Sequence, residues 1–137
     1  IAWVDRGGRE LSKLGPSADY YTVRISDRGR SALLSRALPA TGAYDIWSFD
    51  FARGTETRLT QDDAVTEFAA VASPDNQLMF YGLARGGPPR VVRRDLRTGR
   101  DELMMPADLH LHLVETFSRI GRLLAFARPT DGGFQIP

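Results

Sequence analysis

Two residue types recur along this chain at an interval of about 45 positions. An aspartate that follows an apolar segment and precedes a turn occurs three times, with intervals of 45 and 45, at Asp5, Asp50 and Asp95. A serine that ends an apolar segment also occurs three times, with intervals of 47 and 45, at Ser26, Ser73 and Ser118. A repeat of about 40–45 residues is the length of one four-stranded propeller blade. The double period therefore predicts a repeat of blades.

Each repeat unit also contains short segments with the composition of β-strands. The stretch at residues 44–60 is typical, because the aromatic and β-branched run YDIWSF is followed by a turn at Gly54 and by the alternating segment ETRLT. Three residues after each anchor serine stands a residue that accepts a positive φ, namely Gly29, Asn76 or Gly121. We predict strands near residues 10–14, 21–25, 31–35, 44–49, 56–60, 68–72, 78–81, 91–94, 101–105, 113–117 and 123–126.

The fold expected from this pattern is all-β: a partial β-propeller of about three four-stranded antiparallel blades. A single propeller segment covers residues 1–137, with a half blade at 1–14, blades at 20–62 and 65–107, and a half blade at 110–137. A short helix is compatible with residues 106–111. Closed propellers use about four to eight blades. We therefore expect either a segment of a larger propeller, which the abrupt start at Ile1 and the absence of an initiator methionine favour, or self-association that completes a ring.

Composition excludes several classes of function. Eighteen basic and 17 acidic residues give a net charge of +1, so there is no electrostatic argument for nucleic-acid binding. The absence of cysteine excludes disulfides, thiolate catalysis and cysteine-based zinc sites. No apolar run approaches the roughly 20 residues that a membrane-spanning helix needs, so we expect no direct membrane insertion.

Catalytic and metal-binding patterns are not evident. His110 and His112 would point to one face of a strand, which suits a metal, but no third ligand accompanies them. Asp62 and Asp63 could be paired carboxylates, although loop carboxylates more often cap strands or stay solvated. No nucleophile elbow, Walker loop or dinucleotide-binding glycine motif occurs. We therefore expect no catalytic residue, no metal, no cofactor and no enzymatic activity.

One set of residues suggests a binding surface. Tyr20, Glu67 and His112 each stand six residues before an anchor serine. In the propeller family that the chain resembles, as described below, this position implies the entrance of the innermost strand near the central channel. We predict ligand binding at this channel mouth by these three residues together with Asp62, Asp63 and His110. Polar residues are also common at strand ends that have no binding role, and this simpler interpretation stays open.

The strands also predict the core. Seven aromatic residues inside strands are expected between blades: Trp47, Phe49, Phe68, Phe80, Tyr81, Phe117 and Phe126. The alternation of side chains places Phe68 on one buried face with Ala70 and Ala72, and with Tyr21, Val23 and Ile25 of the preceding repeat.

At Ser73-Pro74-Asp75-Asn76 the chain resembles the TolB-like β-propeller family, whose repeats carry a Ser-Pro-Asp-Gly turn. The segments Asp45-Ile46-Trp47 and Arg58-Leu59-Thr60 are similar to the third and fourth strands of that family. The stretch WVDRGGREL near the start is most similar to propellers fused behind bacterial serine/threonine kinases.

The resemblance implies a non-catalytic module that binds a protein, a small peptide or another ligand. Such a module would be the sensor part of a kinase or a TolB-like periplasmic protein, and it would lie in the periplasm or elsewhere outside the cytoplasm. The alternative is the propeller domain of a prolyl-oligopeptidase-type serine peptidase, which gates substrate access.

Overall fold

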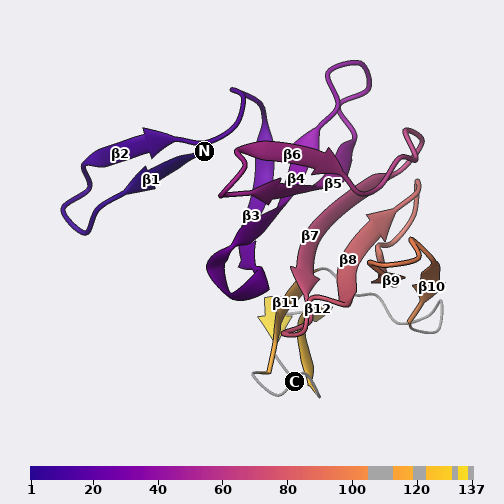
Figure 1. The fold of residues 1–137 in the computed structure, drawn as a ribbon. Helices are drawn as coiled ribbons and strands as arrows, with labels where there is room; N and C mark the ends of the chain where they lie inside the picture. The colour runs from indigo at the N-terminus through magenta and orange to yellow at the C-terminus, as the bar shows by residue number, and fades with distance from the viewer. Residues whose placement is uncertain (105–112, 119–122, 131–132, 136–137) are drawn as a thin grey trace.

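The computed structural model describes residues 1–104, 113–118, 123–130 and 133–135. These residues form four antiparallel sheets that follow one another along the chain (Figure 1). The expected short helix at residues 106–111 lies outside the described residues.

Two of the sheets are complete blades with their four strands in sequence order. The first blade consists of β3 (Tyr20–Ser26), β4 (Ser31–Ala37), β5 (Tyr44–Asp50) and β6 (Thr55–Arg58). The second blade consists of β7 (Thr66–Ala72), β8 (Leu78–Ala84), β9 (Arg90–Asp95) and β10 (Asp101–Leu103). The strands agree with the sequence prediction to within three residues at every end, which confirms the antiparallel four-stranded blade.

Partial sheets flank the two blades. The hairpin of β1 (Ala2–Val4) and β2 (Glu10–Lys13) precedes the first blade and projects away from it in Figure 1. The sheet of β11 (Leu113–Phe117), β12 (Leu124–Thr130) and β13 (Gly133–Gln135) follows the second blade. A single 3-10 turn, η1 (Asp27–Gly29), connects β3 to β4, and no α-helix occurs among the described residues. The all-β partial propeller is therefore confirmed.

The anchor aspartates recur because each one closes a turn. Asp50 Oδ1 accepts hydrogen bonds from the N–H groups of Ala52 and Arg53, both at 2.9 Å. Asp95 Oδ1 accepts them from Arg97 and Thr98 at 2.9 and 2.7 Å. An aspartate side chain that caps the backbone two or three residues later stabilises a tight turn. The same local chemistry is needed once in every blade.

The anchor serines close the hairpin between the first two strands of a blade. Ser73 Oγ accepts the N–H of Leu78 at 3.0 Å, and Ser118 Oγ accepts the N–H of Leu123 at 3.1 Å. In the turn that follows Ser73, Asn76 has a φ of 56°. Gly29 has a φ of 88° in the corresponding turn of the first blade. The positive φ predicted for both positions is confirmed, whereas Gly121 lies outside the described residues.

The main core lies between the two blades. β7, the inner strand of the second blade, packs against β3, β4 and β5 of the first. Buried apolar side chains from both blades meet there, namely Leu33, Ile46, Ala70, Met79, Tyr81 and Val92. Phe49, Phe80 and Tyr81 are buried as expected, while Trp47 and Phe68 are half-buried. The side chains of Phe117 and Phe126 lie outside the described set.

The predicted contact between Phe68 and Tyr21 is present, with ring centroids 6.3 Å apart in an edge-to-face arrangement, but Phe68, Tyr21, Val23 and Ile25 do not form one buried face. The register of β7 shifts between Phe68 and Val71, and Ala69 adopts a φ of 53°. Such a bulge inserts one residue and reverses the facing of the residues on either side of it. Phe68 and Ala70 therefore do not share one face by simple alternation. The side chains of Tyr21, Val23 and Ile25 are 56%, 41% and 54% exposed.

Candidate functional site

The predicted site residues that the structure describes gather at one end of the blades. Tyr20 is the first residue of β3, Glu67 is the second residue of β7, and Asp62 and Asp63 lie in the connection between β6 and β7. Successive strands of a blade are antiparallel, so this end also carries the β4–β5 and β8–β9 loops. His110 and His112 lie outside the described residues.

The two loop aspartates are held by two arginines, Arg85 in the β8–β9 loop and Arg58 at the end of β6. Asp62 forms an ion pair with Arg85, at the start of the β8–β9 loop, and its Oδ1 accepts the N–H of Ala64 at 3.1 Å. Asp63 Oδ1 lies 2.5 Å from a guanidinium nitrogen of Arg58. The side chain of Asp63 is 66% exposed and that of Asp62 is 45% exposed, and solvent-accessible pairs of this kind contribute little to stability individually. They connect the β6–β7 segment to the strands on either side of it.

Tyr20 is fixed within the first blade. Its hydroxyl oxygen lies 3.0 Å from both Glu56 Oε1 and Pro16 O. The other oxygen of Glu56 accepts a hydrogen bond from Arg36 at 2.6 Å. Burial, followed by the hydrogen bond and the charge of Glu56, raises the pKa of Tyr20 to about 12. The phenol therefore stays protonated and joins β3 to β4 and β6.

Glu67 differs most from its predicted role. The sequence placed it on a polar surface at the channel mouth, but the residue is only 3% exposed. Its carboxyl group is within hydrogen-bonding reach of Asp45 in β5 and of Thr60, which follows β6. Both residues therefore lie across the interface from β7. Burial raises the pKa of Glu67 to about 7; the hydrogen bond from Thr60 opposes this rise, and the charge of Asp45 adds to it.

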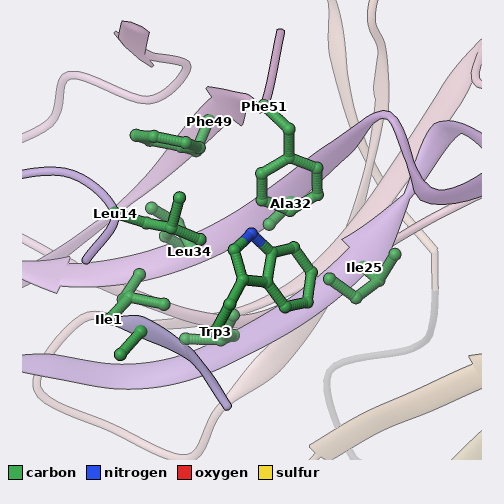
Figure 2. Close-up of a pocket in the computed structure, with 10 residues that line it drawn as sticks. Ile1, Trp3, Leu14, Ile25, Ala32, Leu34, Phe49 and Phe51 are labelled. Atoms are coloured by element: carbon green, nitrogen blue, oxygen red, sulfur yellow. The ribbon is translucent and has the colours of Figure 1, made fainter. Parts of the chain in front are cut away.

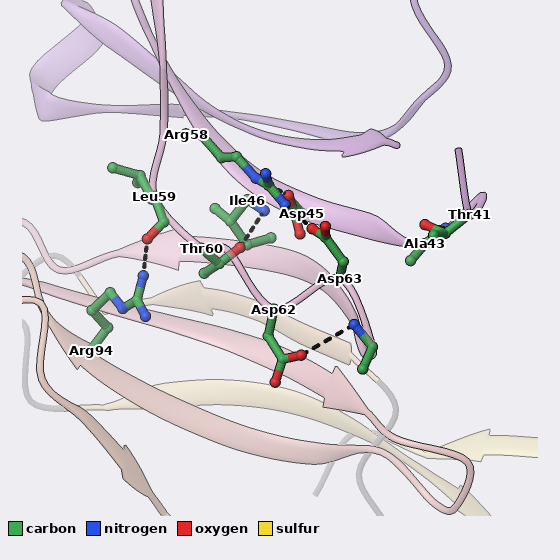
Figure 3. Close-up of polar contacts among 11 residues, drawn as sticks. Thr41, Ala43, Asp45, Ile46, Arg58, Leu59, Thr60, Asp62, Asp63 and Arg94 are labelled. Carbon is green, nitrogen blue, oxygen red and sulfur yellow. Dashed lines mark hydrogen bonds and ion pairs between the residues drawn. The ribbon is translucent and has the colours of Figure 1, made fainter. Parts of the chain in front are cut away.

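The sequence did not predict that Asp45 and Thr60 are partners of Glu67, because the segments that contain them were interpreted only as evidence for the fold. Asp45 in β5 is fully buried and forms an ion pair with Arg58 in β6 (Figure 3). Thr60 Oγ1 accepts the N–H of Ile46 at 2.9 Å. The Asp-Ile-Trp segment and the Arg-Leu-Thr segment thus meet side by side. The signal in the sequence was the presence of both charged residues inside otherwise strand-like segments.

Arg94 completes this polar cluster from the second blade. It forms a two-pronged ion pair with Asp101, with distances of 2.7 and 2.6 Å, and it also donates to the carbonyl oxygen of Leu59 (Figure 3). The guanidinium lies over the ring of Tyr81 at 5.9 Å from its centroid. We call the set Asp45, Arg58, Thr60, Glu67 and Arg94 the interblade polar cluster.

An apolar pocket lies on the face of the first blade that points away from the second blade (Figure 2). It has a cavity volume of about 110 Å³. It is lined by Ile1, Ala2, Trp3, Leu14, Val23, Ile25, Ala32, Leu34, Phe49 and Phe51. The Trp3 and Phe51 rings lie 5.1 Å apart and cover one part of the pocket. The side chains from β3 remain exposed, so this face of the blade is open along its inner strand.

The described residues contain no group of three or more histidine, aspartate or glutamate side chains that could hold a metal ion. Within the same residues, no helix has the length and apolar character needed to cross a membrane.

Comparison with known proteins places the fold. No protein-family model matches the chain, and no curated protein matches it in sequence. Among solved structures, TolB from Acinetobacter baumannii superposes with a TM-score of 0.71 at 19% identity, over 87% of this chain and 29% of that one. A putative TolB from Agrobacterium tumefaciens gives 0.65 at 21% identity, over 94% and 44%.

The tricorn protease gives a TM-score of 0.64 at 12% identity, over 96% of this chain and 14% of that one. The chain therefore spans less than half the length of each of these proteins. At such identities the likeness concerns the fold alone. Together with the two complete blades and the packing of one on the next, it shows that this chain has a TolB-like β-propeller fold.

Proposed function

We propose that this chain is part of a non-catalytic β-propeller that acts as a protein-interaction module within a larger assembly. The observation that carries the proposal is the open apolar face of the first blade, which we define by the exposed side chains of Val23 and Ile25 on β3, beside the buried Ala32, Leu34 and Phe49. Propellers place rigid strands beneath variable loops, so binding is their common role. The sensor segment of a bacterial serine/threonine kinase and a TolB-like periplasmic protein are the two settings that the sequence resemblance favours.

The partner we propose for the open apolar face is a preceding blade of the same repeat type, which would present the counterpart of the face that carries Leu33 and Ile46 in the first blade. The interface between the two blades shows the geometry: β7 packs on β3, β4 and β5, and Met79 and Tyr81 of the second blade meet Leu33 of the first. Met79 and Tyr81 occupy the positions that Ala32 and Leu34 hold on the open face. The arrangement repeats one blade further on, where β11 packs on β7 and β8. At the open face β3 would take the place that β7 takes in this interface, and a preceding blade packed there would bury Val23 and Ile25. Burial of apolar side chains is the main driving force for such association.

Self-association of the 137-residue chain tests this proposal, because in the isolated chain only a second copy can supply another blade. We expect light scattering to show concentration-dependent association for the wild type. Ile25→Thr should weaken it by about tenfold or more, because it removes roughly 1–2 kcal/mol of apolar burial from each face that is covered.

Leu103→Thr is the matched control. Leu103 is 53% exposed, against 54% for Ile25, but it lies on the outermost strand of the second blade. Its replacement should leave association unchanged. A folded wild-type chain that stays monomeric at all concentrations would contradict the proposal, as would equal effects of the two substitutions.

A second setting is a propeller domain attached to a peptidase, which the likeness to the tricorn protease favours. The chain would then be a companion of a hydrolase domain in its parent protein. A fluorophosphonate probe distinguishes this setting: labelling of the parent protein outside this segment would support it, and absence of labelling in an intact parent protein would count against it.

A further inference from the structure

Two buried carboxyl groups face each other across the interface between the blades. Asp45 belongs to β5 of the first blade and is 0% exposed; Glu67 belongs to β7 of the second and is 3% exposed. β5 and β7 are in direct contact. Among the described residues, Asp45 Oδ1 and Glu67 Oε2 have no hydrogen-bond partner. A buried acceptor without a donor is costly, so this pair calls for an explanation.

The cations near the pair are shared with other carboxylates. Arg58 from β6 is bound by Asp45 and also by Asp63 in the β6–β7 connection. Arg94 from β9 attracts Glu67, but its hydrogen bonds go to Asp101 of β10 and to the carbonyl of Leu59. Four carboxyl groups thus share two guanidinium groups.

The remaining groups near Glu67 are neutral. Tyr81 of β8 lies close enough for the charge of Glu67 to raise its pKa, and Thr60 supplies a hydroxyl. Ser35 of β4 is occupied with the N–H of Ala69, at 3.1 Å. Arg58 and Arg94 each serve a second carboxylate, so full ionisation of Asp45 and Glu67 would place two buried anions side by side.

We propose that Asp45 and Glu67 share one proton across the interface, and that this proton joins the two blades at mildly acidic pH. The carboxylic acid of Glu67 donates its O–H to Asp45 Oδ1, which supplies the missing donor to Asp45 and removes one of the two negative charges. Buried carboxyl pairs commonly hold a single proton in this manner. Loss of the proton places two anions at the interface and weakens it.

The direction of the pH dependence follows from the folded and unfolded states. The pKa of Glu67 rises from 4.5 to about 7 on folding, chiefly because of burial. A raised pKa contributes stability that is complete below the unfolded value and is lost as pH rises through the folded value. From pH 5 to pH 8.5, the folding equilibrium constant of the wild type should fall by roughly 50- to 100-fold through this group alone.

Glu67→Gln tests the proposal directly. The amide is close in size, can donate to Asp45, and does not titrate. Urea unfolding of the 137-residue chain is followed from pH 5 to pH 8.5 at one protein concentration. The readout is the difference between the variant and the wild type, so that the contributions of other groups cancel. We expect the variant to lose the fall in stability and to exceed the wild type at pH 8.5. The control is Asp62→Asn, which alters a carboxylate whose side chain is 45% exposed and should keep the wild-type profile.

Infrared spectroscopy of the wild type provides a test that needs no folded variant. A protonated carboxyl signal should be present at pH 6, disappear as pH rises through about 7, and be absent from Glu67→Gln. Parallel pH profiles for the wild type and Glu67→Gln would overturn the proposal. Absence of a protonated carboxyl signal from the wild type at pH 6 would overturn it as well.

Discussion

Replacement of Thr60 by valine removes a buried hydroxyl that accepts the N–H of Ile46 in β5 and hydrogen-bonds to Glu67 in β7. Thr60 is 1% exposed, and its Oγ1 accepts the N–H of Ile46 at 2.9 Å while its hydroxyl also binds Glu67. Valine has nearly the same shape, so packing is preserved and only the hydroxyl is lost. The Ile46 N–H is then left buried without an acceptor.

The magnitude follows from two opposing contributions. A buried donor that loses its partner costs about 1–3 kcal/mol. The additional buried methyl group contributes at most about 0.8 kcal/mol in the opposite direction. We expect the free energy of unfolding to fall by about 1–2 kcal/mol. With an m-value of about 1–3 kcal/mol per molar urea, the midpoint should decrease by roughly 1 M with no change in m.

Equilibrium unfolding in urea, followed by tryptophan fluorescence, measures this change. The matched control is Thr57→Val, because Thr57 lies on the exposed side of β6 and makes none of these buried contacts. An exposed substitution of this kind should change stability by less than about 0.5 kcal/mol. Equal midpoints for Thr60→Val and Thr57→Val would refute the argument that the Thr60 hydroxyl satisfies a buried donor.

Two further predictions concern the second blade. A methyl group at Gly82 would lie 2.7 Å from Cε2 and 2.8 Å from Cζ of Phe68, so Gly82→Ala should destabilise the chain by about 1–2 kcal/mol. Urea unfolding should show partial relief in the double variant with Phe68→Leu and almost no effect of Gly87→Ala, where the methyl group meets nothing within 4 Å. Hydrogen bonds from the N–H groups of Thr98 and Arg97 lower the pKa of Asp95, and this stability is lost as pH falls below about 3.8. Asp95→Ala should therefore be less stable than the wild type at pH 7 and lose less stability between pH 5 and pH 2; an unchanged difference at both pH values would contradict this.

The sequence by itself determined the features that depend on a few neighbouring residues. The anchor residues Asp50, Asp95 and Ser73 form hydrogen bonds to backbone groups two to five positions later. These hydrogen bonds therefore depend only on residues that are close in the sequence. The spacing of the anchor residues then specified the blade repeat and the all-β fold. The strand composition located the aromatic core residues Phe49 and Tyr81, because strands buried on both faces are apolar throughout.

The tertiary structure decided which face of each strand meets another blade. The bulge at Ala69 changed the side of β7 on which Phe68 lies. No feature of the local sequence predicts that this alanine adopts a positive φ. The burial of Glu67 likewise depends on Asp45 and Thr60, which precede it by 22 and 7 positions and reach it only when one blade packs on the next. A polar residue at the start of a strand reads as exposed until its neighbours in space are known. Desolvation and charge, which set the chemistry of the interblade polar cluster, are properties of that packing.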